Sequence, residues 1–174
     1  PYPPRAACEP ALLDALRSQF GGRCNTTQAI REHHGKDESA FPIAPPDAVV
    51  FPETTEECVA IVKLCAAHHA NIIPYGVGTS LEGHVLAIHG GVCVDMSRMN
   101  TIVAVRAEDL NCTVQAGVTR KALNEQLRHA GLMFPVDPGA DASLGGMAST
   151  RASGTSSRTF SAALSMVLTS LWRK

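Results

Sequence analysis

The chain has 174 residues, of which 45% are hydrophobic, and its formal net charge is −1. A chain of this length and composition can bury one ordinary hydrophobic core. The balanced charge and an aromatic content of only 5% give no support for nucleic-acid binding, which relies on basic patches and aromatic stacking.

No apolar run approaches the ~18 residues of a membrane-spanning helix, so we expect no membrane span. The chain begins with Pro1 rather than Met, so we expect the natural sequence to extend upstream, where any targeting segment would lie.

The six cysteines include no C-x-x-C pair. Cys58 and Cys65 stand two turns apart on an expected helix, which separates them by about 10 Å, too far for a disulfide. We therefore expect all six to be reduced and mostly buried thiols.

The first expected element is a short amphipathic helix within residues 9–22. Leu12, Leu13 and Leu16 would share one side of it, and the Gly pair that follows would end it. Residues 31–47 are polar and then rich in Pro, and we expect an ordered loop or arm there.

A strand and a helix follow. Residues 48–51 predict a short strand ended by Pro52. Thr54 and Glu57 then have the spacing of a capping box and predict a helix start. The apolar positions of that helix follow the i, i+3, i+4, i+7 pattern and are Cys58, Ile61, Val62 and Cys65.

Four more strands and a second well-marked helix come next. The helix spans residues 119–131, begins at Thr119 and ends at Gly131. Residues 132–157 predict a loop with at most one helical turn. This order of helices and strands is typical of an α+β or α/β domain. The expected strands lie within residues 71–75, 90–97, 100–109 and 111–118, with Glu108 and Asp109 at a turn, and the helix would bury Leu123, Leu127 and Ala130.

Residues 72–83 form a glycine-rich segment with the spacing G-x-G-x4-G. This differs from the dinucleotide fingerprint G-x-G-x-x-G, and His84 stands where a nucleotide-triphosphate loop needs Lys. Glycines admit positive φ, so successive backbone N–H groups can form a nest for an anion, with Thr79 and Ser80 as further donors. The alternative is a tight turn between two strands with nothing bound.

A second segment, residues 137–157, places several glycines among Ala and Ser. Such a backbone can lie against a flat or extended ligand without intervening side chains. Two segments of this kind favour one long ligand such as a dinucleotide, whereas the alternative is a flexible and poorly packed region.

Five stretches carry a recognisable pattern: "PDAVVFPETTEECVAIVKLCAAHH", "IIPYGVGTSLEG", "GGVCVDMSRM", "AGVTRKALNEQLRHAGLMFPVDPGADASLGGMAST" and "ASGT". Together they resemble flavin-dependent D-lactate dehydrogenases, which are FAD-binding proteins of the p-cresol-methylhydroxylase type. The upstream "REHHGKDES" resembles the N-terminal segment of the same family. The resemblance covers about residues 10–155 and is greatest to mitochondrial animal enzymes.

The resemblance implies an α+β fold. It would comprise the N-terminal subdomain of this FAD-binding type, a small mixed sheet flanked by helices, and the start of a second subdomain. The expected domains are an N-terminal arm and short helix over residues 1–47, an incomplete FAD-binding domain over residues 48–155, and a divergent tail over residues 156–174.

The resemblance also implies FAD as cofactor, a D-2-hydroxy acid such as D-lactate as substrate of the full-length parent, and a mitochondrial location. The chemistry would be hydride transfer from the substrate to the flavin. No residue of the chain matches the catalytic or metal-liganding groups of the family. The residues that match its cofactor-binding segments are Pro74, Tyr75, Gly76, Val77, Gly78, Thr79, Ser80, Leu81, Pro138, Gly139, Ser143, Leu144, Gly145, Gly146, Thr150, Ala152, Ser153 and Gly154.

The chain departs from the family pattern in three places. His84 stands where the pattern has Gly, and Arg151 replaces a small residue and is expected to impair flavin binding. After Thr155 the expected continuation gives way to an unrelated tail, so we expect this chain to be inactive alone. Two alternatives remain: a non-catalytic FAD- or nucleotide-binding or interaction module with an exposed sheet edge, and a tail that arose from an altered reading frame or splice.

Histidines and carboxylates outside these segments give no catalytic pattern. The His pairs at residues 33–34 and 68–69 lack metal-ligand spacing and are expected to face solvent or cap helices. Asp95, Glu82 and Asp141 are expected to be turn or surface carboxylates, and no acid–base pair is expected.

Overall fold

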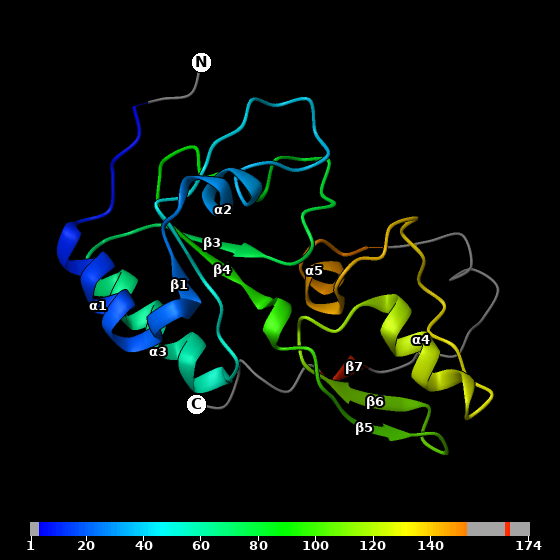
Figure 1. The fold of residues 1–174 in the computed structure, drawn as a ribbon. Helices are drawn as coiled ribbons and strands as arrows, with labels where there is room; N and C mark the ends of the chain where they lie inside the picture. The colour runs from blue at the N-terminus through cyan, green and yellow to red at the C-terminus, as the bar shows by residue number, and fades with distance from the viewer. Residues whose placement is uncertain (1–3, 153–165, 168–174) are drawn as a thin grey trace. The chain divides into compact units, whose positions relative to one another are not determined.

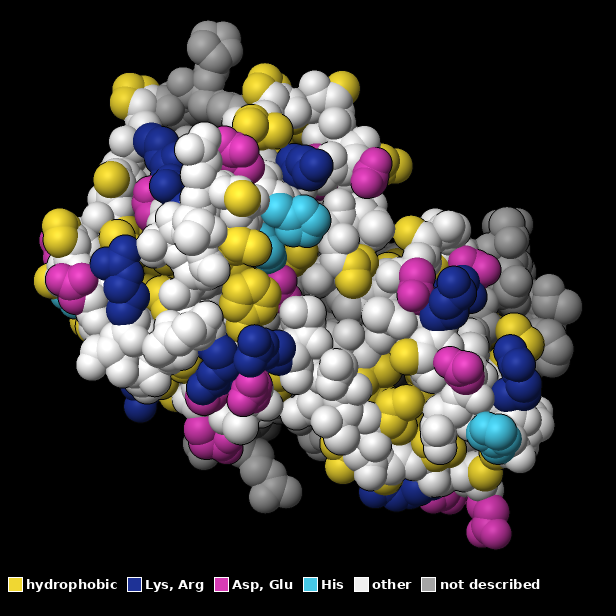
Figure 2. Space-filling model, in the orientation of Figure 1, with side chains coloured by type: hydrophobic (Ala, Val, Ile, Leu, Met, Phe, Trp, Pro, Cys, Tyr) yellow, Lys and Arg dark blue, Asp and Glu magenta, His cyan; other side chains and the backbone are white. Residues whose placement is uncertain are grey.

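The computed structural model describes residues 4–152 and 166–167, and the chain divides into two compact units between Arg98 and Met99 (Figure 1). Among the described residues, no helix is long and apolar enough to cross a membrane. On the face shown in Figure 2, basic and acidic side chains lie intermixed rather than in patches of one sign.

The first unit is built on a four-stranded mixed sheet with the order β1-β2-β4-β3. The strands are β1 (Cys24–Asn25), β2 (Ala48–Val50), β3 (Ile72–Tyr75) and β4 (Val92–Asp95). The last three are mutually parallel, and β1 is antiparallel to β2. All four residues of β4 are buried, as expected for the central strand of a sheet that is covered on both faces.

Two helices cover one face of this sheet, α1 (Pro10–Phe20) and α3 (Thr55–Ala67) (Figure 1). A Pro at the start of α1 and Gly21 just after its end explain the bounds of that helix. Leu12, Leu16 and Phe20 of α1 and Ile61 and Cys65 of α3 pack against Ala48, Val50, Val92 and Val94 of the sheet. Leu13 is only half-buried and packs at the margin of this core.

The opposite face carries a second core, which includes Val49, Ile73, Tyr75 and Cys93 of the strands and Val85 and Ala87 of the following loop. Ile30 of a short helix, α2 (Gln28–His33), packs against it. The sequence predicts only a loop or arm from residue 31 onward and misses this helix. Two single-turn 3-10 helices, η1 (Gly21–Arg23) and η2 (Met96–Arg98), complete the unit.

The capping box of α3 forms as predicted, because the Thr54 hydroxyl accepts a hydrogen bond from the Glu57 N–H at 3.2 Å. Cys58 and Cys65 share a buried face, also as predicted. The prediction for Val62 is wrong, because this residue is 47% exposed. The buried stripe of α3 is narrow, and Val62 lies at the edge of it on the helical projection.

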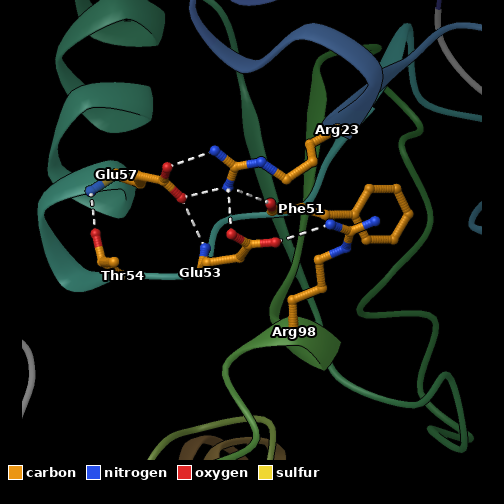
Figure 3. A network of polar contacts seen from close by, with 6 residues as sticks. All are labelled: Arg23, Phe51, Glu53, Thr54, Glu57 and Arg98. Atoms are coloured by element: carbon orange, nitrogen blue, oxygen red, sulfur yellow. Dashed lines mark hydrogen bonds and ion pairs between the residues drawn. The ribbon is translucent and has the colours of Figure 1, made fainter.

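The Glu57 carboxylate joins the start of α3 to neighbouring segments (Figure 3). It accepts two hydrogen bonds of 2.5 Å from the Arg23 guanidinium and one of 2.7 Å from the Glu53 N–H. Arg98 donates to Glu53 at 2.8 Å and lies over the Phe51 ring. The hydrogen bonds from Arg23 are the main cause that lowers the pKa of Glu57 to about 2.

The second unit contains an antiparallel pair, β5 (Ile102–Arg106) and β6 (Asn111–Val114). The backbone of β7 (Met166–Val167) pairs with β6 in parallel. Two helices, α4 (Arg120–Arg128) and α5 (Leu144–Ser149), complete the described part of this unit. Its core consists of Cys112, Val114, Val118, Leu123, Leu127, Phe134, Leu144 and Met147.

The predicted cap of α4 is confirmed, since the Thr119 hydroxyl accepts from the Ala122 N–H at 3.2 Å. Ala130, predicted to face inward, is exposed, because the helix ends at Arg128 and Ala130 belongs to the turn that follows. The six residues of α5 exceed the single helical turn predicted there. The four-stranded sheet of the first unit, with its helices, confirms the predicted small mixed sheet flanked by helices.

All six cysteines are free thiols, as predicted, and five are buried, with Cys8 half-buried. Burial raises the pKa of the Cys65 thiol to about 11, and burial together with Asp47 raises that of Cys8 to about 12. The thiols are therefore protonated at neutral pH.

Candidate functional site

The glycine-rich loop at residues 76–83 leaves the sheet at the end of β3, on the carboxyl side of the parallel strands, where ligands of open α/β sheets usually bind. Gly78 and Gly83 have φ values of +72° and +76°. Within the described part of the chain, no hydrogen-bond acceptor is found for the N–H groups of Val77, Gly78, Thr79 and Ser80. Four successive free donors around a positive φ are the features of an anion nest.

The segment that precedes β2 holds this loop in place. The Asp37 carboxylate accepts a hydrogen bond from the Gly83 N–H at 2.9 Å. The Glu38 N–H donates to the Ser80 carbonyl at 3.0 Å, and the Phe41 ring lies against Gly83. The stretch predicted as a loop or arm therefore serves as a support for the glycine-rich loop.

Position 78 requires a glycine because its φ is positive and because there is no room for a Cβ. A Cβ at this position would collide with the phenol oxygen of Tyr75, which lies over the loop. Tyr75 itself is only 6% exposed. Burial, reinforced by the nearby Asp95 carboxylate, raises the pKa of the Tyr75 phenol to about 12, so the ring is neutral at physiological pH.

A buried pair, His34 and Asp95, lies next to Tyr75. His34 Nε2 is 2.7 Å from Asp95 Oδ2, and the two residues are 3% and 5% exposed. His34 is the C-cap residue of α2, and Asp95 accepts from the Ser97 N–H in a turn, so the predicted capping and turn roles hold. The prediction of solvent-facing side chains is wrong for both. The position of Asp95 at the end of an apolar strand was a signal in the sequence, but nothing in the sequence indicated that His34 would be its partner.

The remaining histidines and carboxylates lie where the sequence places them. His68 is the C-cap residue of α3, and the Asp141 carboxylate accepts from the Lys121 N–H at 2.9 Å. Among the residues that the structure describes, no group of three or more His, Cys, Asp or Glu is arranged to hold a metal ion. His33, His69, His84, His89 and His129 are exposed, and so are Glu82 and Asp141.

The second glycine-rich segment is organised by short polar contacts. The Asp137 carboxylate accepts from the Gly139 N–H at 2.9 Å, and Gly139 has a φ of +85°. Ser143 is buried and caps α5 by accepting from the Gly146 N–H at 3.3 Å. The Thr150 hydroxyl donates to the Gly146 carbonyl at the other end of the helix.

Not every predicted cofactor residue in this segment faces outward. The Leu144 side chain is 0% exposed and belongs to the core of the second unit. The Gly145 N–H donates to the Ala116 carbonyl, and a Cβ at Gly145 would lie 2.8 Å from Ala116. Packing within the chain therefore explains the glycine at 145. Pro138, Gly139 and Thr150 are exposed and Ala152 is half-buried, whereas Ser153 and Gly154 lie outside the described residues.

Arg151 has a φ of 54°, a conformation that favours glycine. It stands at the residue after the C-cap of α5, in a Schellman motif. The Ala152 N–H donates to the Met147 carbonyl at 2.8 Å, and the Arg151 N–H donates to the Ala148 carbonyl at 3.4 Å. Arg151 is thus a departure from the local backbone requirement as well as from the family pattern.

Sequence reasoning missed Arg120, which begins α4. Its guanidinium is 3.3 Å from the Asp137 carboxylate, and its Nε is buried without a hydrogen-bond partner among the described residues. The Arg120 N–H donates to the Ala142 carbonyl. The start of α4 therefore fixes both ends of residues 137–142.

Comparison with known proteins identifies the family. The sequence profile of the FAD binding domain matches residues 46–170. The chain belongs to this family. The match reaches into residues 156–170, and the division of the chain at residue 155 stays a prediction.

Relatives and solved structures agree with this assignment. A probable mitochondrial D-lactate dehydrogenase of Danio rerio is 49% identical over 87% of this chain and 31% of its own length. A mitochondrial cytochrome-type D-lactate dehydrogenase of Arabidopsis thaliana is 44% identical over 82% of this chain and 26% of its own length. The chain thus spans about a third or less of these relatives. An alkyldihydroxyacetonephosphate synthase structure has a TM-score of 0.77 at 26% identity, covering 87% of this chain and 33% of that one.

The fold is also that of p-cresol methylhydroxylase, whose structure gives a TM-score of 0.63 at 22% identity over 72% of this chain and 25% of that one. The predicted family resemblance and the assignment of FAD as cofactor are confirmed. The loop at residues 76–83 fits such a group, because a diphosphate is bound well by free backbone N–H groups in a nest.

Proposed function

We propose that this chain is the FAD-binding portion of an oxidoreductase that oxidises D-lactate or a related D-2-hydroxy acid. The observation that carries the proposal is the row of free N–H donors from Val77 to Ser80 in a chain of the FAD-binding family. The similarity to D-lactate dehydrogenases of zebrafish and plant mitochondria supports the substrate class and a mitochondrial location.

In this proposal, residues 74–81 bind the diphosphate of FAD. The free N–H groups would donate hydrogen bonds to the phosphate oxygens, while Tyr75 packs against Gly78 and Asp37 accepts from the Gly83 N–H. When bound, FAD supplies the acceptor for the hydride of the hydroxy acid. The loop contains no Lys or Arg, so its affinity for a diphosphate depends on the position of backbone dipoles.

Residues 138–154 supply the second set of FAD contacts in this proposal. Pro138, Gly139 and Thr150 are exposed and available to a ligand, whereas Leu144 and Gly145 contribute by packing. Ala152 follows Arg151 in the Schellman motif, so the conformation at Arg151 sets the position of Ala152 relative to α5.

We further propose that the 174-residue chain binds FAD by itself, because the loop at residues 76–83 already presents its free N–H donors. The second candidate is a non-catalytic FAD- or nucleotide-binding module. The left-handed conformation of Arg151, within a predicted cofactor segment, is the observation that favours it.

The test is a titration of the purified chain with FAD, followed by flavin fluorescence and by the visible spectrum after removal of excess ligand. FMN is the comparison ligand, because it lacks the diphosphate bridge. We expect the wild type to retain FAD and to bind FMN more weakly. We expect Gly78→Ala to lose FAD on removal of the excess and to bind FAD no more tightly than FMN. The matched control is Gly22→Ala, since a Cβ at Gly22 meets nothing within 4 Å. Equal binding of FAD by Gly78→Ala and Gly22→Ala contradicts the proposed site.

A further inference from the structure

Four side chains meet at the carboxyl ends of the three parallel strands of the first unit. Phe51 follows β2, Tyr75 ends β3, Asp95 ends β4, and His34 reaches them from the end of α2. The His34 ring is 4.5 Å from the Tyr75 ring and 5.8 Å from the Phe51 ring, measured between centroids. This cluster lies where the glycine-rich loop leaves the sheet.

The hydrogen bonds of His34 fix how many protons the pair holds. Nδ1 is 2.8 Å from the Ile30 carbonyl, which can only accept, so Nδ1 carries a proton. Nε2 is 2.7 Å from Asp95 Oδ2, a distance that requires a proton between them. The other oxygen of Asp95 accepts from the Ser97 N–H. Ring and carboxylate together therefore hold two protons and have no net charge.

Loss of the shared proton would leave a net negative charge at a buried site and two lone pairs facing each other. The other titratable groups around the pair do not compensate. Burial raises the pKa of the Tyr75 phenol to about 12 and raises that of the Cys93 thiol, so both stay neutral. Asp37, which also influences Tyr75, is itself acidic, and the His33 ring lies 5.2 Å away on the exposed side.

The pair is mechanically linked to the loop through Tyr75. One part of the Tyr75 ring lies against His34, and its phenol oxygen lies against Gly78 in the loop. The residues of the loop include Glu82 and no cation that could offset a negative charge beneath it. A change in the protonation of the pair therefore acts on the loop both by contact and by charge.

We infer that His34 and Asp95 are positioning residues for the diphosphate-binding loop, with Tyr75 as the link, and that the loop binds an anionic diphosphate best while the pair retains its shared proton. This inference rests on the proposed function. It adds a positioning role for two buried residues outside residues 74–81.

The decisive variant is Asp95→Asn, which removes the carboxylate of the pair while it preserves the contacts. Its amide oxygen accepts from the Ser97 N–H, its amide nitrogen donates to Nε2 of a neutral His34, and Nδ1 still donates to Ile30. His34→Phe is the complementary variant, because it keeps an aromatic ring beside Tyr75 but leaves Asp95 without its partner.

The first experiment needs no ligand. The chain is labelled with 15N in His and Gly, and NMR spectra are followed as the pH is raised. We expect the amide signals of Gly78 and Gly83 to move together with the ring signals of His34 in the wild type. In Asp95→Asn they should not move in this way. The inference is overturned if the Gly78 and Gly83 amide signals do not shift together with the His34 ring signals. It is also overturned if the glycine signals shift with pH to the same extent in Asp95→Asn.

The second experiment measures FAD affinity against pH in a His84→Gln background, which removes the exposed imidazole next to the loop. We expect affinity to fall about tenfold as the pair loses its proton, to stay level in Asp95→Asn, and to be about tenfold lower at neutral pH in His34→Phe. His33→Gln is the control and should match the background. Unchanged FAD affinity in His34→Phe overturns the inference. Failure of the wild type to bind FAD overturns the proposed function instead, while the ligand-free result stands.

Discussion

Replacement of Arg151 by Gly is expected to stabilise the chain. Arg151 has a φ of 54°, and this left-handed conformation costs an L-residue about 1–2 kcal/mol. Gly removes that cost but loses about 0.5–1 kcal/mol through the greater freedom of its unfolded state. The expected net gain for Arg151→Gly is about 0.5–1 kcal/mol, measured by urea unfolding.

The chain offers controls at equivalent positions. His69 follows the C-cap of α3 with a φ of 51°, and Gly131 follows the end of α4 with a φ of 69°, both within the same hydrogen-bond motif. His69→Gly should therefore stabilise by a similar amount, and Gly131→Ala should destabilise by about 1 kcal/mol. If neither Arg151→Gly nor His69→Gly gains stability, the strain argument is wrong.

Arg151→Ala separates strain from obstruction of the ligand. Ala keeps the backbone strain, so its stability should stay within about 0.5 kcal/mol of the wild type. The expectation that the Arg151 side chain weakens flavin binding predicts that Arg151→Ala raises FAD affinity without a gain in stability. An FAD affinity that rises only in Arg151→Gly points to the backbone instead.

Three further predictions concern Glu57, Gly145 and the thiols. The Glu57 pKa is lowered from 4.5 to about 2, so the contribution of its ion pair with Arg23 is complete above pH 4.5 and is lost as the pH falls toward 2. With a discount for partial exposure, the wild type should lose about 1–2 kcal/mol more than Glu57→Gln over this range in urea unfolding, and parallel curves contradict this. Gly145→Ala should destabilise by about 1–3 kcal/mol because its Cβ meets Ala116, and a second change, Ala116→Gly, should restore part of the loss; no rescue refutes the contact. The six thiols should react slowly with a disulfide reagent at neutral pH and all react in denaturant, since burial is the main cause of the raised pKa values of Cys8 and Cys65; rapid reaction of the native chain is the contrary result.

Local signals in the sequence were sufficient for most helices and strands. Thr54 and Thr119 cap the helices that they were predicted to begin, because capping depends on residues three positions apart. The helix α2 was missed because its six residues carry too short an apolar pattern to be recognised. Val62 was misplaced because the buried stripe of α3 is narrow, and Ala130 was misplaced because α4 ends two residues before it.

The cofactor loop was found from its glycines and its family resemblance, but its supports were not. His34 and Asp95 stand 61 residues apart, and they meet because α2 packs against the face of the sheet that carries Tyr75. The role of Asp37 as acceptor for Gly83 likewise depends on a contact across 46 residues. Such pairings follow from tertiary packing, which residue spacing does not reveal. Gly145 shows the reverse case, since its glycine is explained by packing against Ala116.

The most direct test of the account is FAD binding by the wild-type chain compared with Gly78→Ala. The free N–H groups of residues 77–80 predict that the wild type retains FAD, and the lack of room for a Cβ at Gly78 predicts that Gly78→Ala loses at least about tenfold in affinity. Circular dichroism of both proteins would show whether the fold is retained. A folded wild type that binds no FAD, or a Gly78→Ala variant that binds it equally well, would contradict the assignment of this loop as the diphosphate site.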